Sequence, residues 1–170
     1  LKALRWWRDR CIEWCYNRFE DGKFGDQLYL DDWTTRFEGV HVLQHNGGGI
    51  AAWNVQQYDF TNENGKVFGT RLDGKKFEVV FYHFHYLRFY KDDSVELGRR
   101  VLSENVLNIF YKPYIQYLDS IKNEISKIDN SFDSNGPGLR PLNWKTPLLF
   151  IYRKLRGAYN IFDKQKFSGS

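Results

Sequence analysis

The sequence predicts an α+β fold, with a β-hairpin or small mixed sheet flanked by helices. Apolar residues recur at helical spacing near residue 4 and again beyond residue 95. Between these regions two strand-like segments meet at Asp73–Gly74, a dipeptide typical of tight hairpin turns. Aromatic residues make up 18% of the 170 residues, so the chain is too rich in rings for a disordered polymer and long enough to bury a core.

The first element expected is an amphipathic helix from Leu4 to Phe19. It should end at Asp21–Gly22, and a second short helix or turn should begin at Gln27. Cys11 and Cys15 share a helix face and are too few for a disulfide framework or a four-ligand zinc site. We interpret both as core residues of a protein in a reduced, cytoplasmic setting.

The middle of the chain should form the sheet. A short strand is expected over residues 40–44, followed by the glycine-rich loop 46–49, which is either a site of close ligand approach or a flexible turn. The hairpin should pair residues 67–71 with residues 76–85. Strand alternation then places His83 and His85 on one face, with Tyr82, Phe84 and Tyr86 on the other.

Helical periodicity from residue 95 to about 128 predicts two helices, with a break or kink at Pro113. Residues 131–138 are rich in Ser, Asn, Gly and Pro and are interpreted as a linker. The sequence therefore predicts four segments: a body over 1–94, a helical extension over 95–130, the linker 131–138, and a basic aromatic segment over 139–170.

Positive charge is concentrated near the end of the chain. The formal net charge is +4, yet residues 140–166 hold seven Lys or Arg and one Asp, so the remainder is slightly acidic. Apolar and basic residues interleave there as in helices that lie on anionic membranes, although an ordinary helix with a solvated basic face gives the same pattern. No recognition motif for nucleic acid accompanies the charge, and no run approaches the roughly 20 apolar residues of a membrane span.

Three short motifs occur in an order that resembles a known family. Gly25–Asp26–Gln27, the Ala-Ala-Trp-Asn stretch at 51–54, and His83–Phe84 resemble the carboxyl-terminal half of GT-A-type glycosyltransferases, of the glycogenin-like and lipopolysaccharide galactosyltransferase-like kind. The resemblance covers roughly residues 4–90. It implies the carboxyl-terminal portion of a GT-A-like fold and transfer of a hexose from a nucleotide-diphospho-sugar donor to a saccharide or lipid-linked acceptor, as in bacterial surface polysaccharide synthesis.

The resemblance also implies a metal site. Its His-Phe motif makes His83 the first candidate ligand for Mn²⁺ or Mg²⁺, which would neutralise the departing diphosphate. His85 shares the strand face of His83, and His45 competes because His45-x-x-Gly48 with Trp53 resembles another signature of the family. Two features depart from the family: alanines at 51 and 52 stand in place of Lys and Pro, and Tyr86 stands in place of Gly.

The remaining candidate residues concern the two substrates. Asp26 and Gln27 would orient the acceptor beside the reacting sugar, and Asp31 would help to shape the acceptor groove. Each has a simpler interpretation; Asp26, for example, would cap the helix that follows it. The other candidates are Trp53, Asn54 and Gly48 for saccharide binding and Arg88 for the diphosphate.

The chain contains no Asp-x-Asp, the pair that normally completes such a metal site, and it contains no Met. We therefore expect the pair upstream of Leu1, and we expect this fragment to be inactive alone. A cytoplasmic location follows, with peripheral attachment at the inner face of the cell membrane through 139–170 as an extension. The rival hypothesis is a non-catalytic carbohydrate-binding or adaptor module with a membrane-associating tail.

Overall fold

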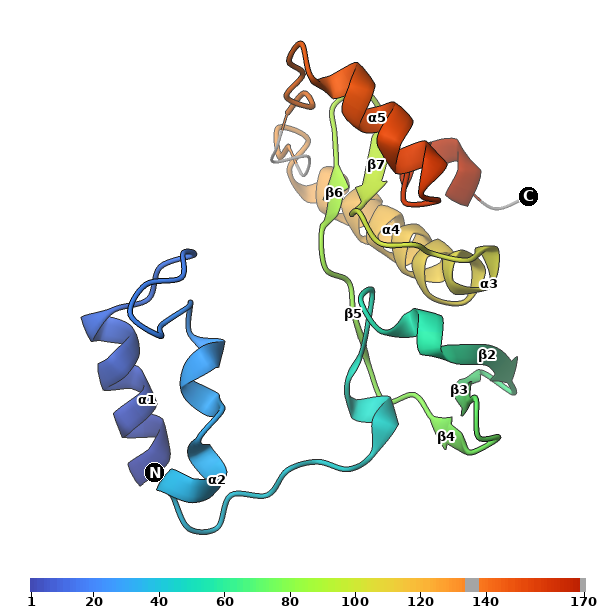
Figure 1. Ribbon diagram of the computed structural model, residues 1–170. Helices are drawn as coiled ribbons and strands as arrows, with labels where there is room; N and C mark the ends of the chain where they lie inside the picture. The colour runs from blue at the N-terminus through green and yellow to red at the C-terminus, as the bar shows by residue number, and fades with distance from the viewer. Residues whose placement is uncertain (134–137, 169–170) are drawn as a thin grey trace. The chain divides into compact units, whose positions relative to one another are not determined.

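The computed structural model describes residues 1–133 and 138–168. It has the expected α+β class: helices accompany three small sheets in the described residues (Figure 1). The chain divides into two compact units, Leu1–Gln44 and His45–Ser170. The predicted 1–94 segment therefore spans the boundary between the units.

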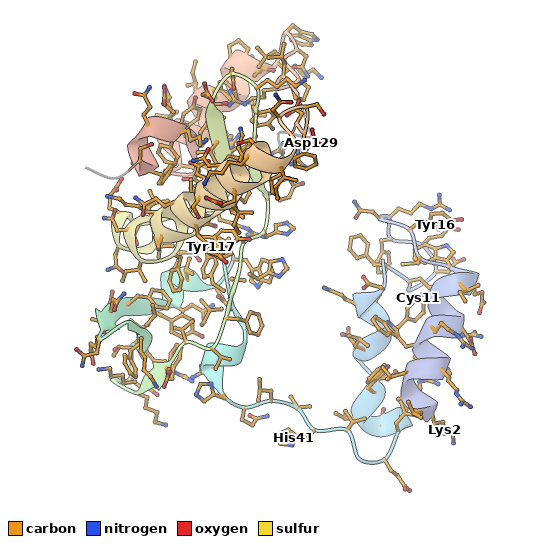
Figure 2. The ribbon with its side chains drawn as sticks, turned by 180° about the vertical axis from the view of Figure 1, so that it is seen from behind. Lys2, Cys11, Tyr16, His41, Tyr117 and Asp129 are labelled. Carbon is orange, nitrogen blue, oxygen red and sulfur yellow. The ribbon has the colours of Figure 1, made fainter. Side chains whose placement is uncertain are left out.

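The first unit is helical. It consists of α1 (Lys2–Glu13), the 3₁₀ helix η1 (Gln27–Leu30) and α2 (Trp33–Arg36). The short helix at Gln27 is confirmed, whereas α1 ends at Glu13, before the expected Phe19. Cys11, labelled in Figure 2, is half-buried. Cys15 is exposed, so its core assignment was wrong.

Edge-to-face contacts between aromatic rings pack the elements of this unit against one another. The ring of Trp6 meets Tyr29 and Phe37 edge-on at 6.1 and 5.6 Å between centroids. The indole N–H of Trp7 donates to the carbonyl oxygen of Asp26 at 2.9 Å. Because no described residue of the unit is fully buried, these edge contacts are its main source of specific packing.

The strand expected over residues 40–44 does not form. Val42 and Leu43 are exposed, at 55% and 63% of their accessible surface, and no described strand pairs with this stretch. A strand needs a hydrogen-bonded neighbour, and the alternating apolar residues here have none.

Small sheets make up much of the second unit. In the described residues, the two-stranded parallel sheet pairs β1 (Ile50–Ala51) with β5 (Tyr82–His83). One antiparallel sheet consists of β2 (Tyr58–Glu63), β3 (Lys66–Arg71) and β4 (Lys76–Glu78). The other antiparallel sheet consists of β6 (Leu87–Phe89), β7 (Ser94–Leu97) and β8 (Ile161–Asp163).

The predicted hairpin is confirmed in its first half only. β3 and β4 pair antiparallel around Gly74, whose φ of +79° suits the tight turn. The second strand does not continue to residue 85, because the backbone N–H of Val80 donates to the carbonyl oxygen of Gly47 at 2.9 Å. The chain thereby leaves the hairpin and pairs with β1 instead.

The helical region begins later than predicted. Val95 and Leu97 are fully buried in β7, not in a helix. Helical structure starts with α3 (Glu104–Val106), where the hydroxyl of Ser103 accepts from the N–H of Val106. A π-helical turn, η4 (Leu107–Tyr111), leads into α4 (Lys112–Ile128). The irregularity expected at Pro113 therefore lies just before that residue, and the helix continues through Pro113.

The end of the chain completes this unit. α5 (Thr146–Leu155) is followed by β8, which pairs with β7, and by η5 (Lys164–Phe167). Phe167 is 2% exposed, and its carbonyl oxygen accepts from the side chain of Gln116 at 2.9 Å. The segment 139–168 thus packs on the sheet of β6 and β7 (Figure 1); residues 134–137 of the predicted linker lie outside the described residues.

The core of the second unit joins the sheets to η4, the turn that leads into α4. Phe60 of β2 meets Phe110 edge-on at 4.9 Å, and Tyr82 stacks on Phe110 at 4.4 Å between ring centroids. Two 3₁₀ helices, η2 (Asn46–Gly48) and η3 (Val55–Gln57), flank β1. None of the helices in the described ranges is long and apolar enough to cross a membrane.

Candidate functional site

Two of the sequence motifs meet at one place in the second unit. The parallel pairing of β1 with β5 sets Ala51 opposite His83, and Trp53 follows Ala51 by two residues. The Trp53 ring lies 5.1 Å from His83 and 5.6 Å from His85, and the two imidazole centroids are 5.7 Å apart. The two histidines therefore share a face as predicted, and the indole ring lies beside both.

The loop that presents Trp53 is fixed by its neighbour. The side-chain oxygen of Asn54 accepts from the backbone N–H of Ala51 at 2.9 Å, and its amide donates to the carbonyl oxygen of Gly49 at 2.8 Å. Asn54 was predicted to bind saccharide, but both polar atoms of its side chain are hydrogen-bonded to the backbone of its own loop. Trp53 itself remains 47% exposed.

A rigid aromatic base supports this face. Phe84 stacks on Tyr114 at 3.9 Å between ring centroids, and the hydroxyl of Tyr82 donates to that of Tyr111 at 3.1 Å. Burial, the nearby Tyr111 and the shared hydrogen bond raise the pKa of Tyr82 far above its ordinary value, so this pair stays neutral. Tyr82 and Phe84 thus point inward, as alternation predicts.

Tyr86 departs from that alternation. Its φ of +66° lies in the left-handed region that glycine favours, and its ring is exposed, 4.7 Å from His85. The guanidinium of Arg88 lies 4.9 Å from the Tyr86 ring centroid. Arg88, predicted to bind diphosphate, therefore stacks on an aromatic face.

Two hollows adjoin the Trp53 face. One has a volume of about 280 Å³ and the other about 470 Å³, and both are lined by Trp53, Arg99 and Arg100. The smaller also includes His85 and Tyr86, and the larger includes residues of α5. The two hollows share these three lining residues and are together called the Arg99–Arg100 cleft; the larger is of a size common for ligand sites.

Two buried side chains, Arg153 and Asn160, and the exposed Gln56 hold the loop that carries these arginines. Arg153 donates to the carbonyl oxygen of Gly98 at 2.8 Å, and Asn160 donates to that of Arg100 at 2.6 Å. Gln56 donates to the carbonyl oxygen of Val101 at 2.6 Å. Three side chains from distant parts of the sequence thus order one short loop, which the sequence did not indicate.

The strongest of these supports is an ion pair inside the unit. Arg153 and Glu96 are 5% and 8% exposed, and their charged atoms lie 3.0 Å apart. The hydroxyl of Tyr90 donates to the other carboxylate oxygen at 3.1 Å. Because both ionic groups are paired and hydrogen-bonded, they can stay charged away from water. The alternation of basic and apolar residues in α5 gave no sign that Arg153 points inward.

The predicted metal ligands do not form a complete site. Among the described residues no three His, Cys, Asp or Glu side chains gather around one point. His83 and His85 offer two imidazoles, whereas His45 packs its ring against Phe77 at 6.5 Å. Two nitrogens do not make up the ligand set of a Mn²⁺ or Mg²⁺ ion, so the metal remains a prediction that needs further ligands.

The candidates Asp26, Gln27 and Asp31 belong to the first unit and His83 to the second. The side chains of Asp26 and Gln27 are exposed, and Asp26 makes no side-chain capping bond to η1. The capping interpretation of Asp26 was therefore wrong, and its acceptor role stays a prediction. Gly48 lies in η2 and is half-buried.

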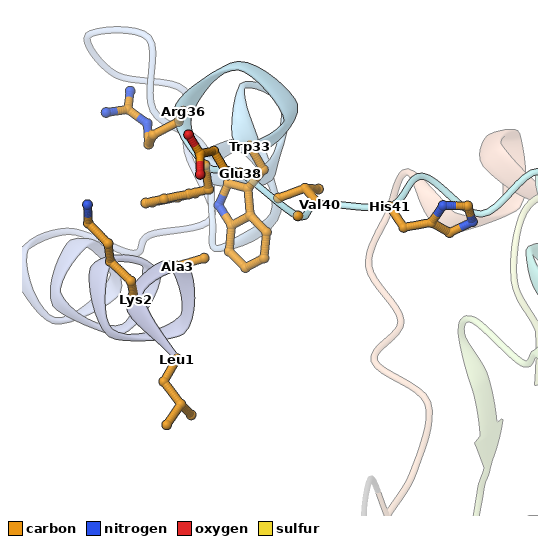
Figure 3. Close-up of a pocket in the computed structure, with 10 residues that line it drawn as sticks. Leu1, Lys2, Ala3, Trp33, Arg36, Glu38, Val40 and His41 are labelled. Carbon is orange, nitrogen blue, oxygen red and sulfur yellow. The ribbon is translucent and has the colours of Figure 1, made fainter.

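The first unit has a hollow of its own, of about 730 Å³, beside Trp33 (Figure 3). Lys2, Arg36, Glu38 and His41 contribute polar groups to its lining, and Asp31 does not line it. The indole N–H of Trp33 is buried and has no partner among the described residues. The hydrogen-bonded guanidinium of Arg36 lowers the pKa of the Asp32 carboxyl.

Comparison with known proteins finds relatives by sequence only. The chain is 29% identical over 144 residues to the uncharacterized protein YfnD of Bacillus subtilis (strain 168), covering 82% of this chain and 44% of that protein. It is 30% identical over 131 residues to the uncharacterized protein YfnF of the same organism, covering 77% and 42%. The chain thus spans less than half the length of these relatives. No family model matches it, and no solved structure does.

Proposed function

We propose that this chain is the acceptor-side part of a sugar-nucleotide-dependent glycosyltransferase with a GT-A-like fold. It would serve the transfer of a hexose to a saccharide or lipid-linked acceptor. The observation that carries the proposal is the meeting of the 51–54 and 83–85 motifs, which sets an exposed indole beside two imidazoles. The resemblance depends on these same motifs.

The chemistry of these groups suits a sugar. A pyranose packs its apolar face on an aromatic plane, and Trp53 offers such a plane on a loop that Asn54 fixes. The imidazole nitrogens of His83 and His85 can hydrogen-bond to hydroxyl groups at the edge of that ring. The cluster would therefore orient a saccharide.

The backbone of Tyr86 gives further support. The resemblance expects glycine at this position, and Tyr86 adopts the positive φ that glycine favours. A non-glycine residue in this conformation is uncommon. The local conformation is thus one that a glycine at this position would readily adopt, although the residue differs.

The test compares the 170-residue chain with the full reading frame that encodes it. Both are incubated with a panel of nucleotide-diphospho-hexoses and Mn²⁺, and release of nucleoside diphosphate is measured. We expect release from the full reading frame, reduced about 100-fold by Trp53→Ala or His83→Ala. Asp26→Ala tests the first unit in the same assay.

His41→Ala serves as the matched control for His83→Ala, because His41 is not part of the cluster of Trp53, His83 and His85. The His41→Ala variant should leave the release rate unchanged. Full activity in both cluster variants would contradict the site. No release from any nucleotide sugar by either protein would contradict the glycosyltransferase proposal.

A second candidate function is a non-catalytic carbohydrate-binding module that attaches to anionic membranes through α5. It is favoured by the exposed apolar residues Leu148, Ile151 and Leu155, at 66%, 56% and 83% exposure and helical spacing. Lys145 and Lys154 flank this face, and their charge complements anionic headgroups.

Sedimentation with anionic and neutral vesicles tests this attachment. Leu148→Glu and Leu155→Glu should abolish binding to the anionic vesicles. Leu72→Glu is the matched control, because Leu72 is 97% exposed in the β3–β4 turn and lies outside α5. Equal sedimentation of all three variants would rule out α5 as the membrane contact.

A further inference from the structure

We propose that the Arg99–Arg100 cleft binds a phosphate or diphosphate ester, the charged part of a lipid-linked saccharide acceptor. The identity of this ligand rests on the proposed function, whereas the anion site itself does not. Neither arginine was singled out by the sequence motifs, and both line each of the two hollows of the cleft.

The charges of Arg99 and Arg100 are not compensated by nearby carboxylates. Arg99 and Arg100 are exposed, and no carboxylate of the described residues lies within ion-pair distance of either guanidinium. Arg156 also lines the larger hollow, and its guanidinium donates to the hydroxyl of Tyr152 at 2.7 Å. Arg99, Arg100 and Arg156 thus line the larger hollow, together with Arg153, whose charge is paired with Glu96. Arginine is the side chain best suited to bidentate phosphate binding.

The loop is also organised before any ligand binds. Buried Arg153 and Asn160 hold the carbonyl oxygens of Gly98 and Arg100, which leaves both arginine side chains directed away from the core. Gly98 has a φ of +88°, and a side chain there would meet Tyr86 at 3.0 Å. A preorganised loop loses little freedom on binding, which is what a specific anion site requires.

The two ends of the cleft differ in a way that identifies the rest of the ligand. The smaller hollow reaches the Trp53 ring and His85, which suit a sugar. The larger has a mixed lining, in which Val101, Leu149 and Ala158 provide apolar contacts beside the arginines, Gln56 and Tyr152. The three apolar side chains can contact an apolar chain. A diphosphate between a sugar and an isoprenoid carries all three parts, so the cleft matches that class of acceptor.

Binding to the full 170-residue chain can be measured by calorimetry with three probes: inorganic pyrophosphate, a nucleoside diphosphate and a short isoprenyl diphosphate. Pyrophosphate should bind, and Arg99→Gln and Arg100→Gln should each weaken binding about tenfold or more. Arg71→Gln, the same change on β3 outside the cleft, is the matched control and should leave binding unchanged. Raising the salt concentration should weaken binding in the unaltered chain.

The other two probes separate the sources of the phosphate. Tighter binding of the isoprenyl diphosphate than of pyrophosphate, lost in Arg99→Gln, supports the acceptor. Tighter binding of the nucleoside diphosphate alone overturns the acceptor assignment and assigns the cleft to the donor. The anion site itself is overturned if pyrophosphate does not bind, or binds equally to the arginine variants with helical content unchanged; neither result depends on the activity assay.

Discussion

Replacement of Arg153 by Met should destabilise the second unit and release the loop that carries Arg99 and Arg100. In the intact protein the guanidinium lies 3.0 Å from the Glu96 carboxylate and 2.8 Å from the Gly98 carbonyl oxygen. Met fills a similar volume but carries no charge and no donor. The Glu96 carboxylate, 8% exposed, would keep only the hydroxyl of Tyr90 of the partners described above.

The expected magnitude follows from these contacts. Leaving one member of a buried ion pair without its partner typically costs about 3–5 kcal/mol, and the lost bond to Gly98 adds about 1 kcal/mol. We therefore expect a loss of about 4–6 kcal/mol, which is a large part of the total stability of an ordinary domain. Adding Glu96→Gln should recover at least half of the loss, because the buried charge is removed while a partner for Tyr90 remains.

Native-state hydrogen exchange is the suitable assay. The amide of Leu97 donates to the carbonyl oxygen of Asn160 at 2.9 Å, so its exchange reports opening of β7 directly. Arg156→Met is the control: this guanidinium is exposed, and its loss should change the opening free energy by less than about 0.5 kcal/mol. If Arg153→Met lowers the Leu97 opening energy by under about 1 kcal/mol, the reasoning about the buried pair is refuted.

Three further predictions concern stability. Gly47→Ala should lower the free energy of unfolding by about 2 kcal/mol or more, because the added Cβ would lie 1.9 Å from the carbonyl oxygen at the end of β4. Gly49→Ala is the control and should be nearly neutral, because the space around Gly49 is open. Equal urea midpoints for the two variants would contradict the packing argument. The pKa of Tyr82 is raised above 10, its ordinary value, in the folded protein. The stability that the Tyr82 phenol contributes is therefore complete below pH 10. It is lost as the pH rises above 10, because the phenol then ionises in the unfolded chain first. Urea titrations above pH 10 should therefore show a shallower fall in unfolding free energy for Tyr82→Phe, by up to about 1.4 kcal/mol per pH unit, and an unchanged slope would exclude this linkage. Ser103→Ala should lower the free energy of unfolding by about 1 kcal/mol, because the helix cap is lost. Thermal unfolding measures this loss. A thermal midpoint equal to that of the unaltered chain would show that the cap contributes nothing.

Local signals in the sequence succeeded where neighbouring residues alone fix the structure. The turn at Asp73–Gly74 formed as predicted because a positive φ at Gly74 is a property of that dipeptide. His83 and His85 lie side by side as predicted, although β5 ends at His83 and His85 lies in the turn that follows it. Both features depend on residues within a few positions of one another.

Errors arose where a segment's structure depends on its partners. Val95 and Leu97 fit a helical pattern but pair with β6 and β8 and are buried. Residues 40–44 alternate like a strand but have no strand beside them in the described chain. The basic α5 pattern suggested a solvated face, yet Arg153 points into the unit because Glu96 lies there.

The sequence by itself determined the α+β class, the hairpin turn and the motifs around Trp53 and His83, because these depend on residue type and short spacing. Only the tertiary structure decided that Trp53 lies beside both histidines, since that requires β1 to pair with β5 across some thirty residues. It also decided that Arg99 and Arg100 line one cleft: Gln56, Arg153 and Asn160 reach their loop from positions 45, 55 and 60 residues away in the chain. Contacts of that range carry no local pattern from which they could have been predicted.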